Sequence, residues 1–163
     1  MIIDFNGSIE DTACNNYIVL LDCLMKQGQY ENSESMLIHN LCDKINDRRI
    51  GSGLLSRKDK LKMNGCVAYN QCDIDDRWFI GIYSINARKR KAKSTVDYID
   101  YSMLTTQLTW VREYLEKRNQ NAAICAHAGD FFYSDKHALK MILDSVFKDS
   151  PIVIYFCEKE IIV

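Results

Sequence analysis

The second half of the chain alternates short apolar runs with longer segments of helical periodicity. Strands are predicted at residues 66–70, 78–85, 122–126 and 151–156, and helices at residues 94–118 and 135–148. In the first of these helices, apolar residues repeat every three or four positions from Val96 to Leu115, which is the spacing of one helix face. This order predicts an α/β domain. Because open α/β sheets bind ligands beyond the carboxyl ends of their strands, the segments after two strands, 86–93 and 127–134, are expected to carry the function.

The first half is less regular. Residues 2–5 form a short apolar run that ends at Asn6-Gly7, a turn signal, and this predicts a first strand. Residues 17–21 are continuously apolar, as in a strand covered on both faces. A helix over residues 11–26 fits the same positions, and periodicity alone does not decide between the two.

Residues 33–46 are predicted to form a helix. Ser33 is a suitable N-cap, and Glu34 favours the positive end of the helix dipole. Residues 47–64 are polar and charged, with Gly51-Ser52-Gly53 inside them. They predict a long connection, which is uncommon in a compact domain and often has a function.

Size and composition predict a single domain over residues 1–163. Of these residues 47% are hydrophobic and 26% are charged, as in globular rather than disordered proteins. No apolar run approaches the ~20 residues of a membrane-spanning helix, and the first residues lack the pattern of a secretory signal. A cytoplasmic protein that does not associate with membranes is therefore expected.

The cysteines and the net charge give no sign of a metal centre or of a polyanionic partner. The seven cysteines form no CxxC pair and no array with zinc-binding spacing. Most of them lie in apolar segments, which is typical of reduced, packed cysteines. The formal net charge is −1. We expect neither a metal nor a cofactor.

Several local sequences resemble those of one known family. The residues that carry the resemblance run from Gly65 to Phe156 and include Gly65-Cys-Val-Ala-Tyr69, Trp78-Phe-Ile-Gly-Ile-Tyr-Ser84 and Ala126-His-Ala-Gly-Asp130. In order and spacing they resemble macrodomains, in particular the small branch that binds or hydrolyses ADP-ribose derivatives. The resemblance implies a three-layer α/β/α sandwich with a mixed central sheet. It implies ADP-ribose or an ADP-ribosylated macromolecule as partner, with hydrolysis of a terminal ADP-ribosyl or 1″-phosphate group as a further expectation.

By the same resemblance, Ser8 and Ile9 follow the first strand where the family contacts adenine. This chain has Gly7-Ser8 where the family usually has Gly-Asp, with Glu10 or Asp11 as stand-ins for the missing aspartate. The first phosphate loop corresponds to residues 22–30, which places Asp22 and Gly28 in the site. An alternative places that loop at residues 50–54.

The second phosphate loop corresponds to the segment after the strand at residues 122–126. The candidate ligand-binding residues there are His127, Ala128, Gly129, Phe131, Phe132 and Tyr133. A glycine allows backbone amides to approach a pyrophosphate closely. Asp130 is the candidate catalytic residue, because a carboxylate beside an anomeric carbon can activate water. The alternative is a strand-to-helix turn with its aromatic residues in the core.

The segment after the strand at residues 78–85 offers Asn86 as a ligand for a ribose hydroxyl. Residues 88–93 contain five cations in six positions, from Arg88 to Lys93. Such a segment steers anionic ligands or contacts nucleic-acid phosphates, and a solvated loop is the alternative. A non-enzymatic interaction module that kept the fold and lost the pocket is the remaining alternative.

Overall fold

The computed structural model describes residues 1–22, 67–72, 77–85, 101–125 and 136–157. They form six strands, two α-helices and one short 3₁₀ helix. In chain order these are β1 (Ile2–Phe5), η1 (Ile9–Asp11), β2 (Asn16–Asp22), β3 (Val67–Cys72), β4 (Arg77–Ile85), α3 (Tyr101–Arg118), β5 (Ala122–Cys125), α4 (Lys136–Phe147) and β6 (Ile154–Cys157). The predicted helix at 33–46 and the predicted connection at 47–64 lie outside the described residues.

The strands form one mixed sheet in the order β1-β6-β5-β2-β4-β3. Five neighbouring strands are parallel, and only β3 runs antiparallel, beside β4. The prediction of an α/β domain with a mixed sheet is confirmed. The strand prediction for residues 17–21 is also confirmed, and the helix alternative over residues 11–26 is wrong. Because β2 pairs with β4 on one side and with β5 on the other, this segment is a strand, which periodicity alone did not establish.

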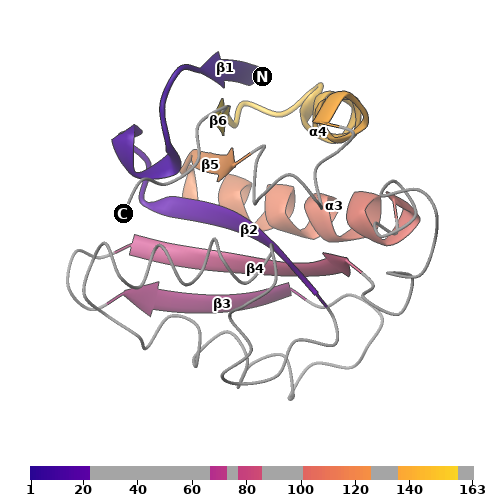
Figure 1. Ribbon diagram of the computed structural model, residues 1–163, viewed down its shortest axis with the longest axis horizontal. Helices are drawn as coiled ribbons and strands as arrows, with labels where there is room; N and C mark the ends of the chain where they lie inside the picture. The colour runs from indigo at the N-terminus through magenta and orange to yellow at the C-terminus, as the bar shows by residue number, and fades with distance from the viewer. Residues whose placement is uncertain (23–66, 73–76, 86–100, 126–135, 158–163) are drawn as a thin grey trace.

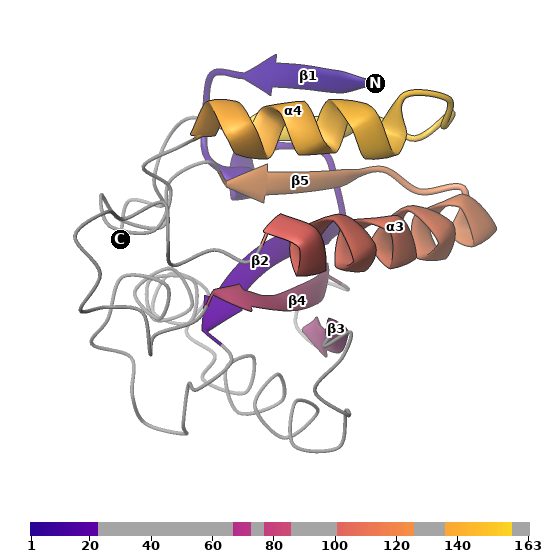
Figure 2. The same ribbon diagram turned by 90° about the vertical axis from the view of Figure 1, so that its right-hand side faces the viewer.

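Helices α3 and α4 lie on one face of the sheet, and η1 with the β1–β2 connection lies on the other (Figures 1 and 2). The face of α3 that points to the sheet carries Leu104, Leu108, Val111 and Leu115, all fully buried. These positions repeat every three or four residues, so they form one apolar stripe. At the centre of the sheet the rings of Tyr17 and Phe79 pack edge to face, with centroids 5.5 Å apart.

Helix α3 ends in a hydrogen-bonded cap. Asn119 adopts a left-handed conformation, with φ of 49°. Its N–H donates to the oxygen of Glu116, and the N–H of Gln120 donates to the oxygen of Leu115, both at 3.1 Å. This pair of bonds is a Schellman motif, which satisfies carbonyl groups at the helix end. It turns the chain directly into β5.

The last strand begins later than predicted. The prediction placed it at residues 151–156, whereas β6 is Ile154–Cys157. The reason is that two N–H groups before it bond to side chains instead of a neighbouring strand. Ile152 donates to Ser150 Oγ at 3.3 Å, and Val153 donates to Asn121 Oδ1 at 2.9 Å. Regular pairing with β1 and β5 starts only at Ile154.

Candidate functional site

The parallel part of the sheet defines two opposite edges. Strands β1, β6, β5, β2 and β4 all end at one edge, the carboxyl edge, and all begin at the other, the amino edge (Figure 2). Ligands of open α/β sheets bind at the carboxyl edge. The chain leaves β2, β4 and β5 there, so the segments that follow these strands start at the predicted site.

The described part of the carboxyl edge is the turn from β1 into η1. Gly7 donates its N–H to the oxygen of Phe5 at 3.0 Å. A Cβ on Gly7 would lie 2.7 Å from Cε1 of Phe5 and 3.2 Å from Oδ2 of Asp11. Such a contact is closer than carbon atoms tolerate, so a side chain at this position would force the Phe5 ring or the turn to shift.

Asp11 closes this turn. Its Oδ2 accepts hydrogen bonds from both the N–H and the hydroxyl of Ser8, each at 3.0 Å. Ser8 is 5% exposed and Ile9 is fully buried. Thus the Ser8 hydroxyl and N–H bond within the turn, while Asp11 is exposed at the surface.

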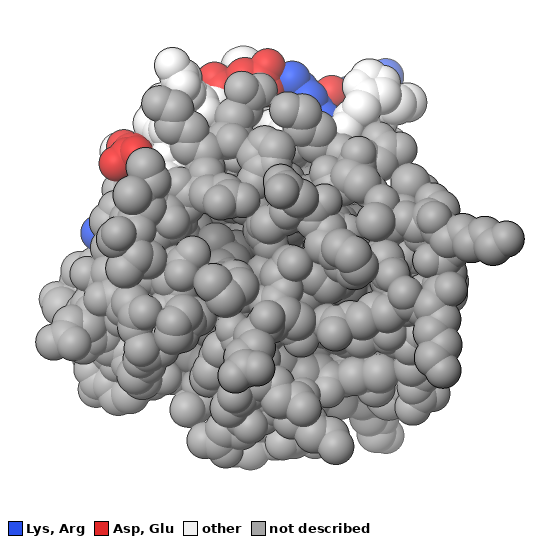
Figure 3. Space-filling view, viewed as in Figure 1, with Lys and Arg blue, Asp and Glu red and all other residues white. Residues whose placement is uncertain are grey.

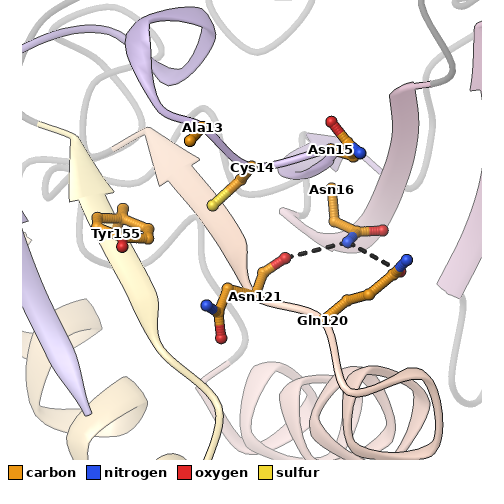
Figure 4. A pocket seen from close by; sticks show the side chains of 7 residues that line it. All are labelled: Ala13, Cys14, Asn15, Asn16, Gln120, Asn121 and Tyr155. Carbon is orange, nitrogen blue, oxygen red and sulfur yellow. Dashed lines mark hydrogen bonds between the residues drawn. The ribbon is translucent and has the colours of Figure 1, made fainter.

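The amino edge contains a cavity of about 190 Å³. It is lined by Ala13, Cys14, Asn15, Asn16, Gln120, Asn121 and Tyr155. Two segments supply most of this lining, one entering β2 and one entering β5, and Tyr155 comes from β6 (Figure 4). None of the described residues that line the cavity carries a charged side chain.

Asn16 connects the two segments that line the cavity. It is 1% exposed, and its Nδ2 donates to the main-chain oxygen of Asn121 at 3.0 Å and to Oε1 of Gln120 at 3.2 Å (Figure 4). These bonds lie next to the pairing of Tyr17 with Ala123, where β2 meets β5. The hydrogen bonds of Asn16 therefore hold the two lining segments together and also help to align strands β2 and β5.

Cys14 contributes a thiol group to the lining of this cavity. Its side chain is free of any disulfide and buried. Burial raises the pKa of the Cys14 thiol, and a hydrogen bond with Thr12 partly opposes that rise. Since the thiolate is the reactive form, Cys14 stays a neutral and weakly reactive thiol at neutral pH.

Charged residues of both signs lie side by side over β1 and α4 (Figure 3). Lys140 of α4 lies 2.7 Å from the carboxylate of Asp4 in β1. The described residues visible in that view form no patch of a single sign. The basic segment Arg88–Lys93 lies outside the part of the chain that the structure describes.

No protein-family model matches the sequence, and no curated protein shows significant similarity to it. Solved structures do resemble the fold. The macrodomain of Mycobacterium tuberculosis DarG has a TM-score of 0.68 and 11% identity, and the alignment covers 98% of this chain and 99% of that one. A macrodomain protein from Streptomyces coelicolor has a TM-score of 0.67 and 10% identity, with the same coverage.

Thermosipho africanus DarTG, whose structure holds ADP-ribose, has a TM-score of 0.58 and 12% identity, covering 95% of this chain and 41% of that one. This chain has the macrodomain fold. The three-layer α/β/α architecture that the sequence resemblance implied is thereby confirmed.

Within this macrodomain fold, the structure places only part of the predicted site. Ser8 and Ile9 lie in the turn after β1, and Asp22 is the last residue of β2, all at the carboxyl edge. The predicted residues that fall outside the described part are Gly28, Asn86, His127, Ala128, Gly129, Asp130, Phe131, Phe132 and Tyr133. The segment carrying the last seven follows β5, so it leaves the sheet from the carboxyl edge.

The cavity at the amino edge of the macrodomain was not predicted. Its sequence signal is present in two polar runs that precede apolar strands, Asn15-Asn16 and Asn119-Gln120-Asn121. Such runs are usually read as turn signals only. The pairing of β2 with β5 brings these two polar runs together, and the cavity forms between them.

None of the helices in the described ranges combines the length and apolar character needed to cross a bilayer. In the same ranges, no three or more His, Cys, Asp or Glu side chains are grouped so that they could hold a metal ion.

Proposed function

We propose that the carboxyl edge binds ADP-ribose or the ADP-ribosyl group of a modified macromolecule. The observation that carries the proposal is the likeness to a DarTG structure that contains ADP-ribose, over 95% of this chain. Two further points support it. Five parallel strands end at that edge, and a segment containing Gly129 and three aromatic residues follows β5.

In this proposal, the backbone amides around Gly129 bind the diphosphate as neutral donors. Phe131, Phe132 and Tyr133 supply flat apolar surface for the adenine or a ribose. In the turn after β1, Ile9 is fully buried, so the exposed carboxylate of Asp11 is the side chain that we propose faces the ligand there. Asp22 and Gly28 belong to the segment that leaves β2, and Asn86 to the one that leaves β4.

Isothermal calorimetry with ADP-ribose tests this proposal, with ADP and ribose 5-phosphate as partial ligands. We expect saturable heat from ADP-ribose below about 1 mM, the range of a specific but weak complex. Gly129→Glu should abolish it by placing a carboxylate against the diphosphate. Ser145→Glu is the matched control, because it adds the same charge at an exposed position of α4. No saturation at millimolar ADP-ribose would refute the proposal.

Hydrolysis is a separate part of the proposal and rests on Asp130. Its carboxylate would take a proton from water as the water oxygen bonds to the anomeric carbon. The bond from that carbon to its substituent breaks, and the substituent leaves with the bonding electrons and takes a proton from solvent. We expect Asp130→Asn to retain ADP-ribose binding and to lose release of ADP-ribose from a modified substrate. If the unmodified protein binds ADP-ribose but releases nothing from ADP-ribosylated peptide, ADP-ribosylated DNA or ADP-ribose 1″-phosphate, binding without turnover is the function.

One observation favours the non-enzymatic alternative. Ser8 stands where the family usually has an aspartate, and its hydroxyl and N–H bond to Asp11 within the turn. A binding module that has lost this contact would tolerate Gly129→Glu without losing a macromolecular partner.

A further inference from the structure

We propose that Cys125 and Cys157 are an oxidative modification site, and that hydrogen peroxide joins them in a reversible disulfide. Strands β5 and β6 are neighbours in the sheet (Figure 1), and their register makes these two residues Cα partners. Among the registers of the described strands, this is the only pair of two cysteines. The inference concerns a covalent bond within the sheet, so it does not depend on the proposed binding of ADP-ribose.

The spacing of the two strands suits a disulfide. Neighbouring strands lie about 4.8 Å apart, and the Cα atoms of a disulfide are usually about 4.4 to 6.8 Å apart. Residues in register on parallel strands share one face of the sheet, because successive positions alternate between the two faces. The Cβ atoms of a disulfide are about 3.5 to 4.5 Å apart, so the two chains need to approach one another slightly.

The position of the pair permits this approach. Cys125 is the last residue of β5, and Cys157 is the last residue of β6. The pairing of β6 with β1 also ends at this level, where Phe5 is the partner of Cys157. A small movement of the two strand ends therefore leaves the pairing before them intact. A disulfide that closes under mild strain is also more easily reduced, which makes the link reversible.

The two thiols have different roles. Cys157 is a fully buried thiol that takes part in no disulfide. Its Sγ lies 3.7 Å from the main-chain oxygen of Tyr155, to which the S–H donates. A buried, protonated thiol reacts poorly with peroxide. Cys125 is therefore the cysteine that is oxidised first, and Cys157 is the thiol that reacts with the product.

The reaction consumes one peroxide and balances in two steps. In the first, the O–O bond of hydrogen peroxide breaks, one oxygen bonds to the Cys125 sulfur, and the other leaves as water with the thiol proton. The product is a sulfenic acid. In the second, the Cys157 sulfur bonds to the Cys125 sulfur, the S–O bond breaks, and the hydroxyl leaves as water with the Cys157 proton. Two thiols are oxidised to one disulfide, and the peroxide is reduced to two waters.

The disulfide has a consequence for stability. In the unfolded chain it would close a long loop from residue 125 to residue 157, a stretch that contains helix α4. Such a link stabilises the folded state because it restricts the unfolded chain. The oxidised protein should therefore unfold at a higher temperature than the reduced protein.

Peptide mapping after oxidation tests the proposal. The folded protein is treated with hydrogen peroxide, its remaining thiols are alkylated, and it is digested with trypsin without reduction. Cleavage after lysine and arginine leaves Cys125 as the only cysteine of residues 119–136 and Cys157 as the only cysteine of residues 149–159. We expect these two peptides to be joined in monomeric protein and to be separated by dithiothreitol. Protein oxidised in urea should instead give a mixture of cysteine pairings.

Three variants assign the roles of the thiols. In Cys157→Ser, oxidation should stop at the sulfenic acid, so that dimedone labels Cys125. In Cys125→Ser, dimedone should not label Cys157. Neither variant should unfold at a higher temperature after oxidation, and circular dichroism checks that both are folded. Cys14→Ser is the matched control, because it removes a buried thiol at the opposite edge of the sheet, and it should form the link as the unmodified protein does.

Two outcomes would overturn the proposal. The first is absence of the joined peptides from the oxidised, folded monomer. The second is a joined pair that is no more abundant there than in protein oxidised in urea. Since the test detects a covalent bond and not a ligand, failure of ADP-ribose binding leaves it intact.

Discussion

The two edges of this sheet differ in how their turns are held. At the amino edge, Asn16 and the Schellman motif at Asn119 fix the approach to β2 and β5 through bonds to the main chain. At the carboxyl edge, the one described turn is held by a carboxylate, Asp11, and by the absence of a side chain on Gly7.

The difference teaches that side chains at the amino edge act on the alignment of the central strands, whereas those at the carboxyl edge act on the turn after β1. Main-chain bonds at the amino edge constrain the alignment of the central strands whatever the ligand. The carboxyl edge is where the chain leaves β2, β4 and β5 with segments of widely differing length. Substitutions at the two edges should therefore have different effects.

The largest effect is expected from Asn16→Asp. The new carboxylate would face the oxygens of Asn121 and Gln120 without a donor, and an uncompensated buried charge costs about 3 to 5 kcal/mol. Urea denaturation at pH 7 measures the loss. Because protonation restores a donor and the folded state raises the pKa of this acid, the loss should shrink as the pH falls. Asn15→Asp, at an exposed position, is the control.

Gly7→Ala should cost less, about 1 to 3 kcal/mol, the range for overpacking. The added Cβ would lie 2.7 Å from the Phe5 ring, so the turn or the ring must shift. The same variant should weaken ADP-ribose binding in calorimetry if this turn lines the site. Asn6→Ala, one residue earlier and exposed, should change neither quantity. Wild-type stability in Gly7→Ala would show that the turn relaxes freely.

Asn119→Gly should stabilise the protein by about 0.5 kcal/mol, because glycine adopts a positive φ without steric cost. Asn119→Ala, which introduces a residue poorly suited to φ of 49°, should destabilise it by about 1 kcal/mol. Thermal unfolding of the pair measures both changes. Equal stability of the two variants would mean that the cap does not hold the amino edge.

The weakest effect is expected from Cys14, and only in alkaline solution. Burial raises its pKa above the ordinary value of 9.0, so the folded state keeps the proton that the unfolded state loses. The thiol's contribution to stability is complete below pH 9 and falls as the pH rises through the folded pKa. Cys14→Ala should therefore show a shallower loss of stability as the pH rises above the ordinary thiol pKa of 9.0. Parallel curves of stability against pH for Cys14→Ala and the unmodified protein would contradict this prediction.

The sequence predicted most of the described fold because its apolar runs are long and clearly spaced. The helix stripe of α3 and the apolar run of β4 are examples. Prediction was ambiguous at residues 17–21, where only pairing with two neighbours excludes a helix. It misplaced the start of β6 because Ser150 and Asn121 compete for the N–H groups before it. Side-chain competition of this kind leaves no periodic signal.

The candidate sites were predictable to different degrees. The carboxyl edge follows from strand order, so the segment around Gly129 could be assigned to it from sequence alone. The cavity at the amino edge depends on the bonds that Asn16 makes to Gln120 and Asn121, which lie 104 and 105 residues away in the chain. No local pattern contains that information.

The pairing of β1 with β6 has a consequence for how the protein is made. Residues 2–5 are synthesised long before residues 154–157, yet within the described part of the sheet these residues form the strand with which β1 pairs. Contacts so distant in sequence form slowly, because a long loop must close first. During synthesis β1 must therefore wait for this partner until β6 has been made. A chaperone that shields nascent strands should raise the yield of native protein more than it would for a fold whose first strand pairs early.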